Sequence, residues 1–324
     1  MTVFPAELAG LEESLTKRLA DVETMLRAEI TSEYELADIT ARHLVEAGGK
    51  RFRPLLTLLA SHFGNSDAPG VVPSAVVVEL THLATLYHDD VMDEALVRRG
   101  APSANSRWGN TVAILSGDFL FARSSKILAD LGPEAVRVQA ETFERLVIGQ
   151  LRESVGPQYG EDPIDHHIQV LADKTGSLIA AAGRYGAMMS GVDPVLTNHI
   201  ADFGECIGVV FQLSDDLLDI ESEVSGKTPG TDLREGIKTL PVLLALADEN
   251  TSEELRNLLS GPLQDESLHA RALSELRNHP AMDQARGVLN SWAQKARDLL
   301  GNLPDIEAKT ALSVLVDSVS DRKI

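Results

Sequence analysis

Residues 74–97 read SAVVVELTHLATLYHDDVMDEALV, and they decide the fold that we predict. The stretch contains no glycine or proline, and its apolar residues recur at spacings of three and four, which is the period of an α-helix. It is apolar on more than one face, as expected of a helix in the middle of a bundle. We predict comparable long helices over residues 110–131, 163–190 and 194–221.

The same helical period extends from residue 7 to residue 320, and alternation with period two is nearly absent. Breaks rich in glycine, proline and small polar residues are predicted at 48–49, 64–70, 99–102, 132–133, 156–163, 193–194, 225–230 and 301–304. They leave roughly a dozen helices, with shorter, peripheral ones after about Asn250. We find no linker or repeat, and therefore predict one all-α domain over residues 1–324.

Composition excludes several classes of function. A formal net charge of −20 argues against a general nucleic-acid-binding surface. Cys206 is the only cysteine, so no intramolecular disulfide and no cysteine-based metal site can form. No stretch approaches the length of a membrane span, and the first residues lack the pattern of a secretion signal. We predict a cytoplasmic protein that meets a bilayer, if at all, only from outside when it releases its product.

An aspartate motif, Asp89-Asp90-x-x-Asp93, interrupts the first long apolar segment. Positions i and i+4 share a face of a helix, so Asp89 and Asp93 project together. Burying these carboxylates without compensation would be very costly, so they must face solvent, cations or a metal. For one such motif, a solvated helix face is the more common explanation.

A second copy, Asp215-Asp216-x-x-Asp219, lies in another long apolar segment, and two independent accidents are much less common than one. Carboxylates without nitrogen or sulfur ligands favour Mg²⁺, which is usually held together with water and substrate phosphates. A metal would bridge the carboxylates to a diphosphate and neutralise the charge that develops when it departs. The pair of motifs therefore predicts ionisation of a diphosphate ester.

Basic residues are few, yet Gly48-Gly49-Lys50-Arg51-Phe52-Arg53-Pro54 places three at a predicted helix start, which favours anions. A second pair, Arg98-Arg99, is predicted to follow one to two turns after Asp93 on the same helix. Ser225-Gly226-Lys227-Thr228 does not form a phosphate-binding P-loop, because the required earlier glycine position is Glu221.

Taken together and in order, these features resemble the long-chain trans-polyprenyl diphosphate synthases, a family of isoprenyl diphosphate synthases. The resemblance runs from about residue 40 to residue 245 and rests on Gly49-Lys50-x-x-Arg53, His82, both aspartate motifs, Arg98-Arg99-Gly100, Lys174-Thr175, Gln212, and Gly226-Lys227 with Thr231-Asp232. It implies an all-α bundle around a central substrate cavity and, as a family expectation, a homodimer.

The resemblance assigns roles to these residues. A pocket for isopentenyl diphosphate would comprise Gly49, Lys50, Arg53, His82 and Arg99. The allylic diphosphate (geranyl, farnesyl or geranylgeranyl) would contact Arg98, Lys174, Lys227 and Lys238. Three Mg²⁺ ions would bind with it, chiefly through Asp89, Asp93 and Asp215, with Asp90, Asp216 and Asp219 acting through water or as supporting groups.

The implied reaction is ionisation of the allylic diphosphate to a carbocation, attack by the isopentenyl double bond and loss of a proton. Thr175 and Gln212 would offer oxygen dipoles to the cation, and the departing diphosphate would take the proton.

Product length is predicted from Ala84 and Thr85, which lie about 7 Å before Asp89 along the helix axis. Short-chain members of the family have a bulky aromatic residue there, so the small residues predict a product longer than farnesyl. A geranylgeranyl diphosphate synthase is the alternative, with Phe119 or Phe121 as a deeper floor. A terpene cyclase or a non-catalytic partner subunit is disfavoured, because both motifs and the basic pocket are present.

Overall fold

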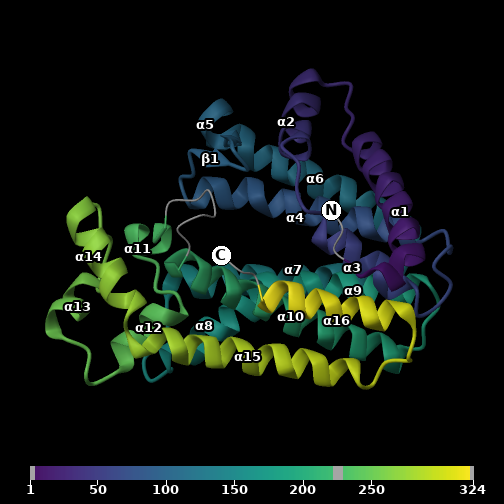
Figure 1. Ribbon diagram of the computed structural model, residues 1–324. Helices are drawn as coiled ribbons and strands as arrows, with labels where there is room; N and C mark the ends of the chain where they lie inside the picture. Colours follow the sequence, from purple (N-terminus) through teal and green to yellow (C-terminus); the bar gives the residue numbers. More distant parts are fainter. Residues whose placement is uncertain (1–3, 222–228, 322–324) are drawn as a thin grey trace. The chain divides into compact units, whose positions relative to one another are not determined.

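The computed structural model describes residues 4–221 and 229–321, and it is helical almost throughout, which confirms the all-α prediction. The described chain divides into two compact units, each assembled from separate stretches of sequence (Figure 1). The boundary falls within α7 (Pro133–Val155), α10 (Pro194–Glu221) and α16 (Glu307–Ser320), and each of these helices is assigned partly to each unit. It also assigns Ser177, the first residue of α9 (Ser177–Met189), to the second unit and the rest of that helix to the first.

The first unit contains Met1–Glu144, Leu178–Gly204 and Asn302–Leu312. Besides parts of α7, α10 and α16 it contains the following elements: η1 (Ala6–Leu8), α1 (Ala9–Glu29), α2 (Glu35–Glu46), α3 (Phe52–Ser61), α4 (Val71–Met92), β1 (Val97–Arg98), β2 (Ala101–Pro102), α5 (Ala104–Trp108), α6 (Asn110–Leu131) and α9 (Ser177–Met189).

Helix α4 is the centre of this unit, as its apolar sequence predicts. It packs against α1, α3 and α6, and Figure 1 shows α4 and α6 side by side. Gly117 permits this approach, because a Cβ atom there would lie 3.0 Å from the carbonyl oxygen of Ala84 and closer still to the His88 ring. The first aspartate motif is therefore carried on a helix that is fixed by its neighbours.

The end of α4 corrects one prediction. The helix stops at Met92 rather than Val97, and the chain then forms a two-stranded hairpin in which Val97 pairs with Pro102. Arg98 and Arg99 are therefore on a hairpin and not on the helix of Asp89. The physical reason is the left-handed backbone of Glu94, with φ of 50°, which an α-helix cannot accommodate.

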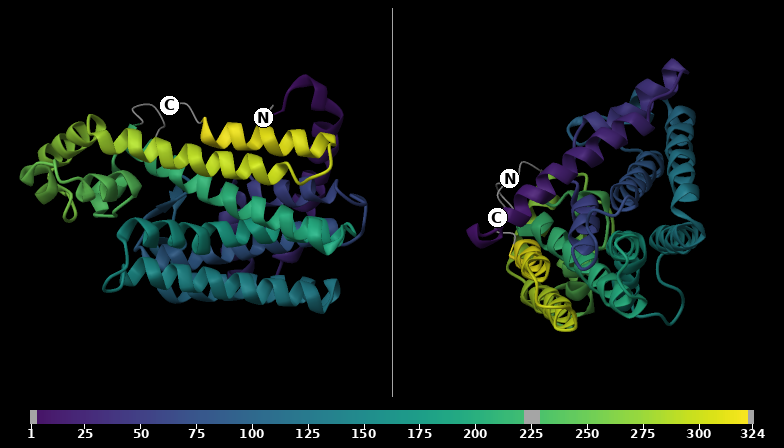
Figure 2. Two further views of the ribbon diagram at one scale, coloured as in Figure 1. Left: turned by 90° about the horizontal axis from the view of Figure 1, so that it is seen from below. Right: turned by 90° about the vertical axis from the view of Figure 1, so that its right-hand side faces the viewer.

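The second unit contains Arg145–Ser177, Glu205–Gly301 and Ser313–Ile324. Besides the remaining parts of α7, α10 and α16 it contains these elements: α8 (Pro163–Leu171), the π-helical turn η2 (Ala172–Gly176), α11 (Thr231–Glu235), α12 (Leu240–Ala247), α13 (Glu253–Leu258), α14 (Glu266–Arg277) and α15 (Pro280–Leu300). Helix α15 packs against α12 and α14, and this part of the chain can be followed in yellow-green in Figure 2.

Most predicted helix limits are confirmed. Helices α6 and α10 begin and end where the sequence predicts, and the predicted segment 163–190 is helical but contains a π turn at Ala172–Gly176. Helix α15 is longer than the short C-terminal helices that we expected. Among the described residues, no helix is both long and apolar enough to cross a bilayer.

Candidate functional site

The first aspartate motif lies in the last turn of α4, with Asp93 as the residue that caps the helix. Asp89 is half-buried, Asp90 is fully buried and Asp93 is exposed. Carboxylates are unfavourable at this end of a helix, where the backbone dipole is negative, whereas a cation is favourable. The position of the motif therefore favours the binding of a cation.

The hairpin after α4 directs two consecutive arginines to different neighbours. Its two turn residues, Arg99 and Gly100, have φ values of 54° and 77°, as a type I′ turn requires. The Arg98 Nε donates to Asp90 Oδ1 at 2.6 Å, whereas Arg99 Nη1 donates to the carbonyl oxygens of Leu44, at 3.0 Å, and Gly48. Arg98 thus lies on the aspartate motif, and Arg99 lies on the glycine-containing loop before α3.

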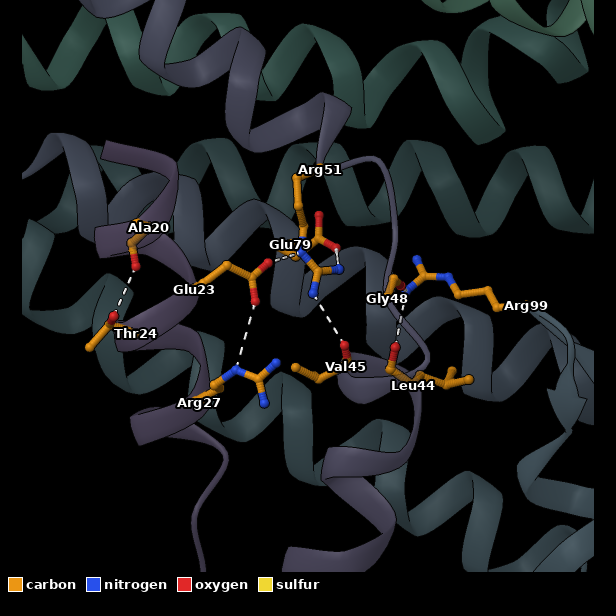
Figure 3. Close-up of polar contacts among 10 residues, drawn as sticks. All are labelled: Ala20, Glu23, Thr24, Arg27, Leu44, Val45, Gly48, Arg51, Glu79 and Arg99. Carbon is orange, nitrogen blue, oxygen red and sulfur yellow. Dashed lines mark hydrogen bonds and ion pairs between the residues drawn. The ribbon is translucent and has the colours of Figure 1, made fainter. Parts of the chain in front are cut away.

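That loop, the hairpin and the adjacent face of α4 contribute a set of basic residue types, which we call the basic pocket: Lys50, Arg51, Arg53, His82 and Arg99 (Figure 3 shows Arg51 and Arg99). Gly49 lies against it, because a Cβ atom at this position would come within 3.0 Å of Arg51 Nη1 and 3.1 Å of Arg99 Nη1. The Nε atom of Arg53 is buried and has no hydrogen-bond partner among the described residues. An unsatisfied buried donor of this kind suits an anionic ligand.

Burial and charge in the basic pocket shift the pKa values of its titratable groups. Burial lowers the pKa of Arg53 to about 10. Burial also holds the pKa of His82 well below its ordinary value, and the positive charges of Arg53 and Arg99 depress it further. His82 is therefore neutral in the free protein near pH 7, and a bound diphosphate would reduce the repulsion that keeps it so.

The second aspartate motif lies in the last two turns of α10 and is tied to several segments of the second unit. Asp216 is buried, with its Oδ2 2.8 Å from His167 Nε2 and 3.1 Å from the backbone nitrogen of Leu240. Asp219 accepts hydrogen bonds from the backbone nitrogens of Thr231 and Asp232. These contacts hold the first residues of α11 and of α12 close to the motif.

The remaining predicted residues of the second unit fall into two groups. Gln212 is half-buried one turn before Asp216, and the exposed Lys238 is two residues before Leu240. Gln212 is thus near the second motif in sequence. Lys238 belongs to the segment that is hydrogen-bonded to the motif through Leu240. Lys227 lies outside the described residues.

Lys174 and Thr175 occupy the π turn, and π turns inside helices occur frequently at functional sites. Arg145 on α7 holds this turn through Asp173 Oδ1, at 3.0 and 3.1 Å, and it also pairs with Glu205 at 2.6 Å. Lys174 itself pairs with Glu153. The turn is therefore positioned by a network of charged residues rather than by helical hydrogen bonding alone.

The two predicted chain-length residues are both buried on α4. Ala84 is fully buried, and Thr85 donates its hydroxyl proton to the carbonyl oxygen of His82. The ring of Phe121 lies 5.8 Å from that of His88 and 4.6 Å from that of Phe143, whereas Phe119 packs against the guanidinium of Arg123. Phe121 thus contacts α4 through His88.

The donor set fits Mg²⁺. Asp90 Oδ2 is buried and has no hydrogen-bond partner in the part of the chain that the structure describes. Within residues 4–221 and 229–321, potential ligands form no group of three or more that could hold a metal on their own. Mg²⁺ commonly takes one or two carboxylates and completes its shell with water and substrate phosphate, and the carboxylate oxygens of the aspartate motifs are ligands of this kind.

Sequence reasoning missed several residues around these sites. Arg51 was passed over between Lys50 and Arg53, and Glu79 was not singled out although it is a lone carboxylate in an apolar helix, three residues before His82. That isolated charge was a usable signal. His167 and Arg145 carry no comparable signal, because their partners lie 49 and 28 residues away along the chain.

Comparison with known proteins identifies the family. The model of the polyprenyl synthetase family matches residues 35–276. The chain is 48% identical to a nonaprenyl diphosphate synthase of Mycobacterium tuberculosis, covering 94% of this chain and 92% of that protein. Among solved structures, a geranylgeranyl pyrophosphate synthase from Corynebacterium glutamicum superposes with a TM-score of 0.87 at 44% identity, covering 97% of both chains. A decaprenyl diphosphate synthase from Rhodobacter capsulatus superposes with a TM-score of 0.88 at 33% identity, covering 97% of this chain and 98% of that one. The chain therefore belongs to the polyprenyl synthetase family and is a trans-prenyltransferase with the all-α fold of these enzymes.

Proposed function

We propose that the protein condenses isopentenyl diphosphate with an allylic diphosphate to make a trans-polyprenyl diphosphate longer than farnesyl. The observation that carries this proposal is the divergence of Arg98 and Arg99. Arg98 lies on an aspartate motif suited to a metal-bound diphosphate, and Arg99 lies in a basic pocket suited to a diphosphate without metal. Two such sites, contacted by adjacent arginines of one hairpin, suit an enzyme with two diphosphate substrates.

We propose that three Mg²⁺ ions bind with the allylic diphosphate, through Asp89, Asp93 and Asp215, while Asp90, Asp216 and Asp219 act through water or as supporting groups. Asp90 and Asp216 are the buried members of their motifs, which supports a supporting role for these two. The Corynebacterium glutamicum enzyme was crystallised in complex with calcium and isoprenyl diphosphate, in keeping with a divalent metal. When bound, the metal neutralises negative charge on the departing diphosphate.

The side chains then position the two substrates. Arg98, Lys174, Lys227 and Lys238 bind the allylic diphosphate, whether geranyl, farnesyl or geranylgeranyl diphosphate. Gly49, Lys50, Arg53, His82 and Arg99 bind isopentenyl diphosphate. This arrangement separates the diphosphate that leaves from the one that stays on the product.

The reaction needs no nucleophilic side chain. The allylic carbon–oxygen bond breaks and its electron pair leaves with the diphosphate. The double bond of isopentenyl diphosphate then supplies the pair for the new carbon–carbon bond. The released diphosphate takes the proton that restores a double bond, while Thr175 and Gln212 direct oxygen dipoles at the cation.

Product length is set along α4 in this proposal, because Ala84 and Thr85 leave room beyond the first motif. The 48% identical relative is a nonaprenyl diphosphate synthase, which favours a long product. A geranylgeranyl diphosphate synthase is the second candidate. Phe121 favours it, since its ring packs against His88 beside the first motif.

We further propose that the protein acts as a homodimer in the cytoplasm, with residues 1–324 as one catalytic domain. The exposed apolar side chains of Ile114 and Leu115 on α6 support association with a second copy. The net charge of −20 supports the absence of a nucleic-acid partner.

One assay tests the proposed function. The protein is incubated with labelled isopentenyl diphosphate, Mg²⁺ and each allylic primer in turn, and the products are sized by chromatography. Products of about 30 carbons or more are expected, since each addition contributes five. Accumulation of the 20-carbon product would favour the geranylgeranyl alternative, and no incorporation with any primer would refute both.

A further inference from the structure

A carboxylate is buried beside the basic pocket. Glu79 lies on α4, three residues before His82, and is only 2% exposed. Burial lowers the pKa of Arg53 and of Arg99, and the negative charge of Glu79 opposes this effect. Against the effect of burial, the hydrogen bond with Glu23 and the charge of Glu79 together raise the pKa of Arg51. Glu79 thus compensates three guanidinium groups at once while no diphosphate is bound.

Arg51 connects this carboxylate to the loop before α3 (Figure 3). Its Nη1 lies 2.8 Å from Glu79 Oε1, its Nε contacts Glu23 on α1, and its Nη2 lies 3.3 Å from the carbonyl oxygen of Val45. The side chain is 9% exposed. Each guanidinium nitrogen is therefore committed to the protein, so Arg51 is not placed to serve as a ligand of the substrate.

The backbone of Arg51 is strained. Among the described residues, only Arg51, Glu94 and Arg99 are non-glycine residues with positive φ, and all three lie next to the candidate site. Such conformations persist where surrounding contacts over-determine them, and they cluster at functional sites. In Arg51 the determining contacts are those to Glu79, Glu23 and Val45.

We infer that Arg51 and Glu79 are positioning residues: their ion pair holds the loop in the left-handed turn that presents Lys50 and Arg53 to isopentenyl diphosphate. This inference rests on the proposed function, which makes the basic pocket the site of that substrate. Lys50 directly precedes Arg51 and Arg53 follows two residues later, so the backbone of Arg51 determines where both cations point. Stability alone is a weak reason for a buried ion pair, since apolar replacements often serve equally well.

Two substitutions separate the ion pair from the backbone turn. In Arg51→Gly the turn is easily adopted, because glycine tolerates positive φ, but the guanidinium is lost. In Glu79→Gln the volume is kept and the charge is removed. Asp67→Asn is the matched control, because it weakens another ion pair of the same unit, Arg18 with Asp67, away from the basic pocket.

Steady-state kinetics with each substrate varied in turn, with unfolding temperature measured alongside, give the test. We expect Arg51→Gly to raise the KM for isopentenyl diphosphate by about tenfold, Glu79→Gln by about threefold, and neither to change kcat or the KM for the allylic substrate by more than about twofold. Asp67→Asn should leave all three constants unchanged.

A wild-type KM for isopentenyl diphosphate in Arg51→Gly would overturn the inference, because the turn alone would then suffice. Equal rises in both KM values would also overturn it, since they would indicate a general loss of structure. If Arg51→Gly does not fold, Glu79→Gln decides by the same criteria. Failure of the proposed function is distinguishable, because the unsubstituted protein would then incorporate no isopentenyl diphosphate.

Discussion

At the scale of single residues, the aspartates of each motif differ in their surroundings. Asp90 is buried and paired with Arg98, and Asp216 is buried and paired with His167, whereas Asp89 and Asp215 are half-buried. Identical side chains four or fewer positions apart therefore lie in different surroundings. We propose that the less buried ones bind a metal and that the buried ones fix the local structure.

Replacing Asp89 or Asp215 with asparagine should lower kcat by about a thousandfold, since several kcal/mol of charge stabilisation would be lost and each 1.4 kcal/mol is tenfold. Circular dichroism should show unchanged helicity. Asp283→Asn on α15, where the side chain is 86% exposed, is the control and should behave as wild type. Near-normal turnover in either motif variant would refute the metal assignment.

His82 gives the protein a specific dependence of stability on pH. Burial and the charges of Arg53 and Arg99 hold its pKa in the folded state well below 6.5, so below about pH 6.5 the unfolded chain binds the additional proton. The contribution of neutral His82 to the free energy of unfolding is therefore present above about pH 6.5 and is lost as the pH falls.

The substitution His82→Gln should remove this dependence. Urea unfolding at pH 7.5 and pH 5.5 should show that wild type loses more free energy of unfolding than the variant, by up to about 1.4 kcal/mol per pH unit. His62, whose pKa burial also lowers, is common to both proteins and cancels. Equal losses would show that His82 titrates normally in the folded protein.

At the scale of elements, the π turn that carries Lys174 and Thr175 depends on close contact with α7. Gly149 makes this contact possible, because a Cβ atom there would lie 2.7 Å from the backbone nitrogen of Lys174 and 3.0 Å from Asp173 Cβ. The backbone of the π turn cannot relieve such a close contact unless the turn itself moves. A small change in α7 should therefore displace Lys174 and Thr175, which we propose to be catalytic.

We expect Gly149→Ala to lower kcat by about ten- to a hundredfold, because it displaces groups that act on the transition state. Gly287→Ala on α15 is the matched control, since its Cβ atom would meet nothing within 4 Å and alanine favours a helix interior by about 1 kcal/mol. The control should be at least as stable as wild type with unchanged kcat. Full activity of Gly149→Ala would show that the π turn tolerates displacement.

Helix α4 should also control product length. Ala84→Phe should shorten the product, and the smaller Ala84→Leu should shorten it less, because both fill space next to the first motif. Ala84 is fully buried, so unfolding temperatures must accompany chromatography of the products. A folded variant with an unchanged product distribution would contradict the assigned direction of chain growth.

At the scale of the whole molecule, metal and diphosphate should stabilise the fold more together than separately. The aspartates repel a diphosphate unless a cation bridges them, so Mg²⁺ with inorganic pyrophosphate should raise the unfolding temperature more than the sum of either alone. At a ligand concentration a hundred times the dissociation constant, the free energy of unfolding would rise by about 2.7 kcal/mol. Asp89→Asn and Asp215→Asn should each abolish the synergy, and a purely additive effect would argue against a shared site.

The sequence predicts local structure better than contacts between distant segments. The limits of α6 and α10 follow from Gly132, Pro133 and Pro194, which act within a few residues. The end of α4 was missed because no glycine or proline occurs before Gly100, and the positive φ of Glu94 depends on the surrounding structure.

The same limit applies to the candidate site. The family resemblance, now confirmed, supplied the motifs, whereas the assigned roles of their residues remain predictions. The sequence does not show that Arg51 reaches Glu79, 28 residues away, or that His167 reaches Asp216, 49 residues away. Such pairs depend on the three-dimensional packing of the helices.

The hairpin of Arg98 and Arg99 has a consequence for the order of substrate binding. A single peptide unit joins the two guanidinium-bearing residues, and the two turn residues of the hairpin, Arg99 and Gly100, both have left-handed backbone conformations. If a metal-bound allylic diphosphate draws Arg98 away from Asp90, Arg99 moves with it. Occupancy of one substrate site would then change the affinity of the other, and this coupling is reciprocal. Chain elongation, in which each product becomes the next allylic substrate, would thereby gain a built-in signal that the primer is in place.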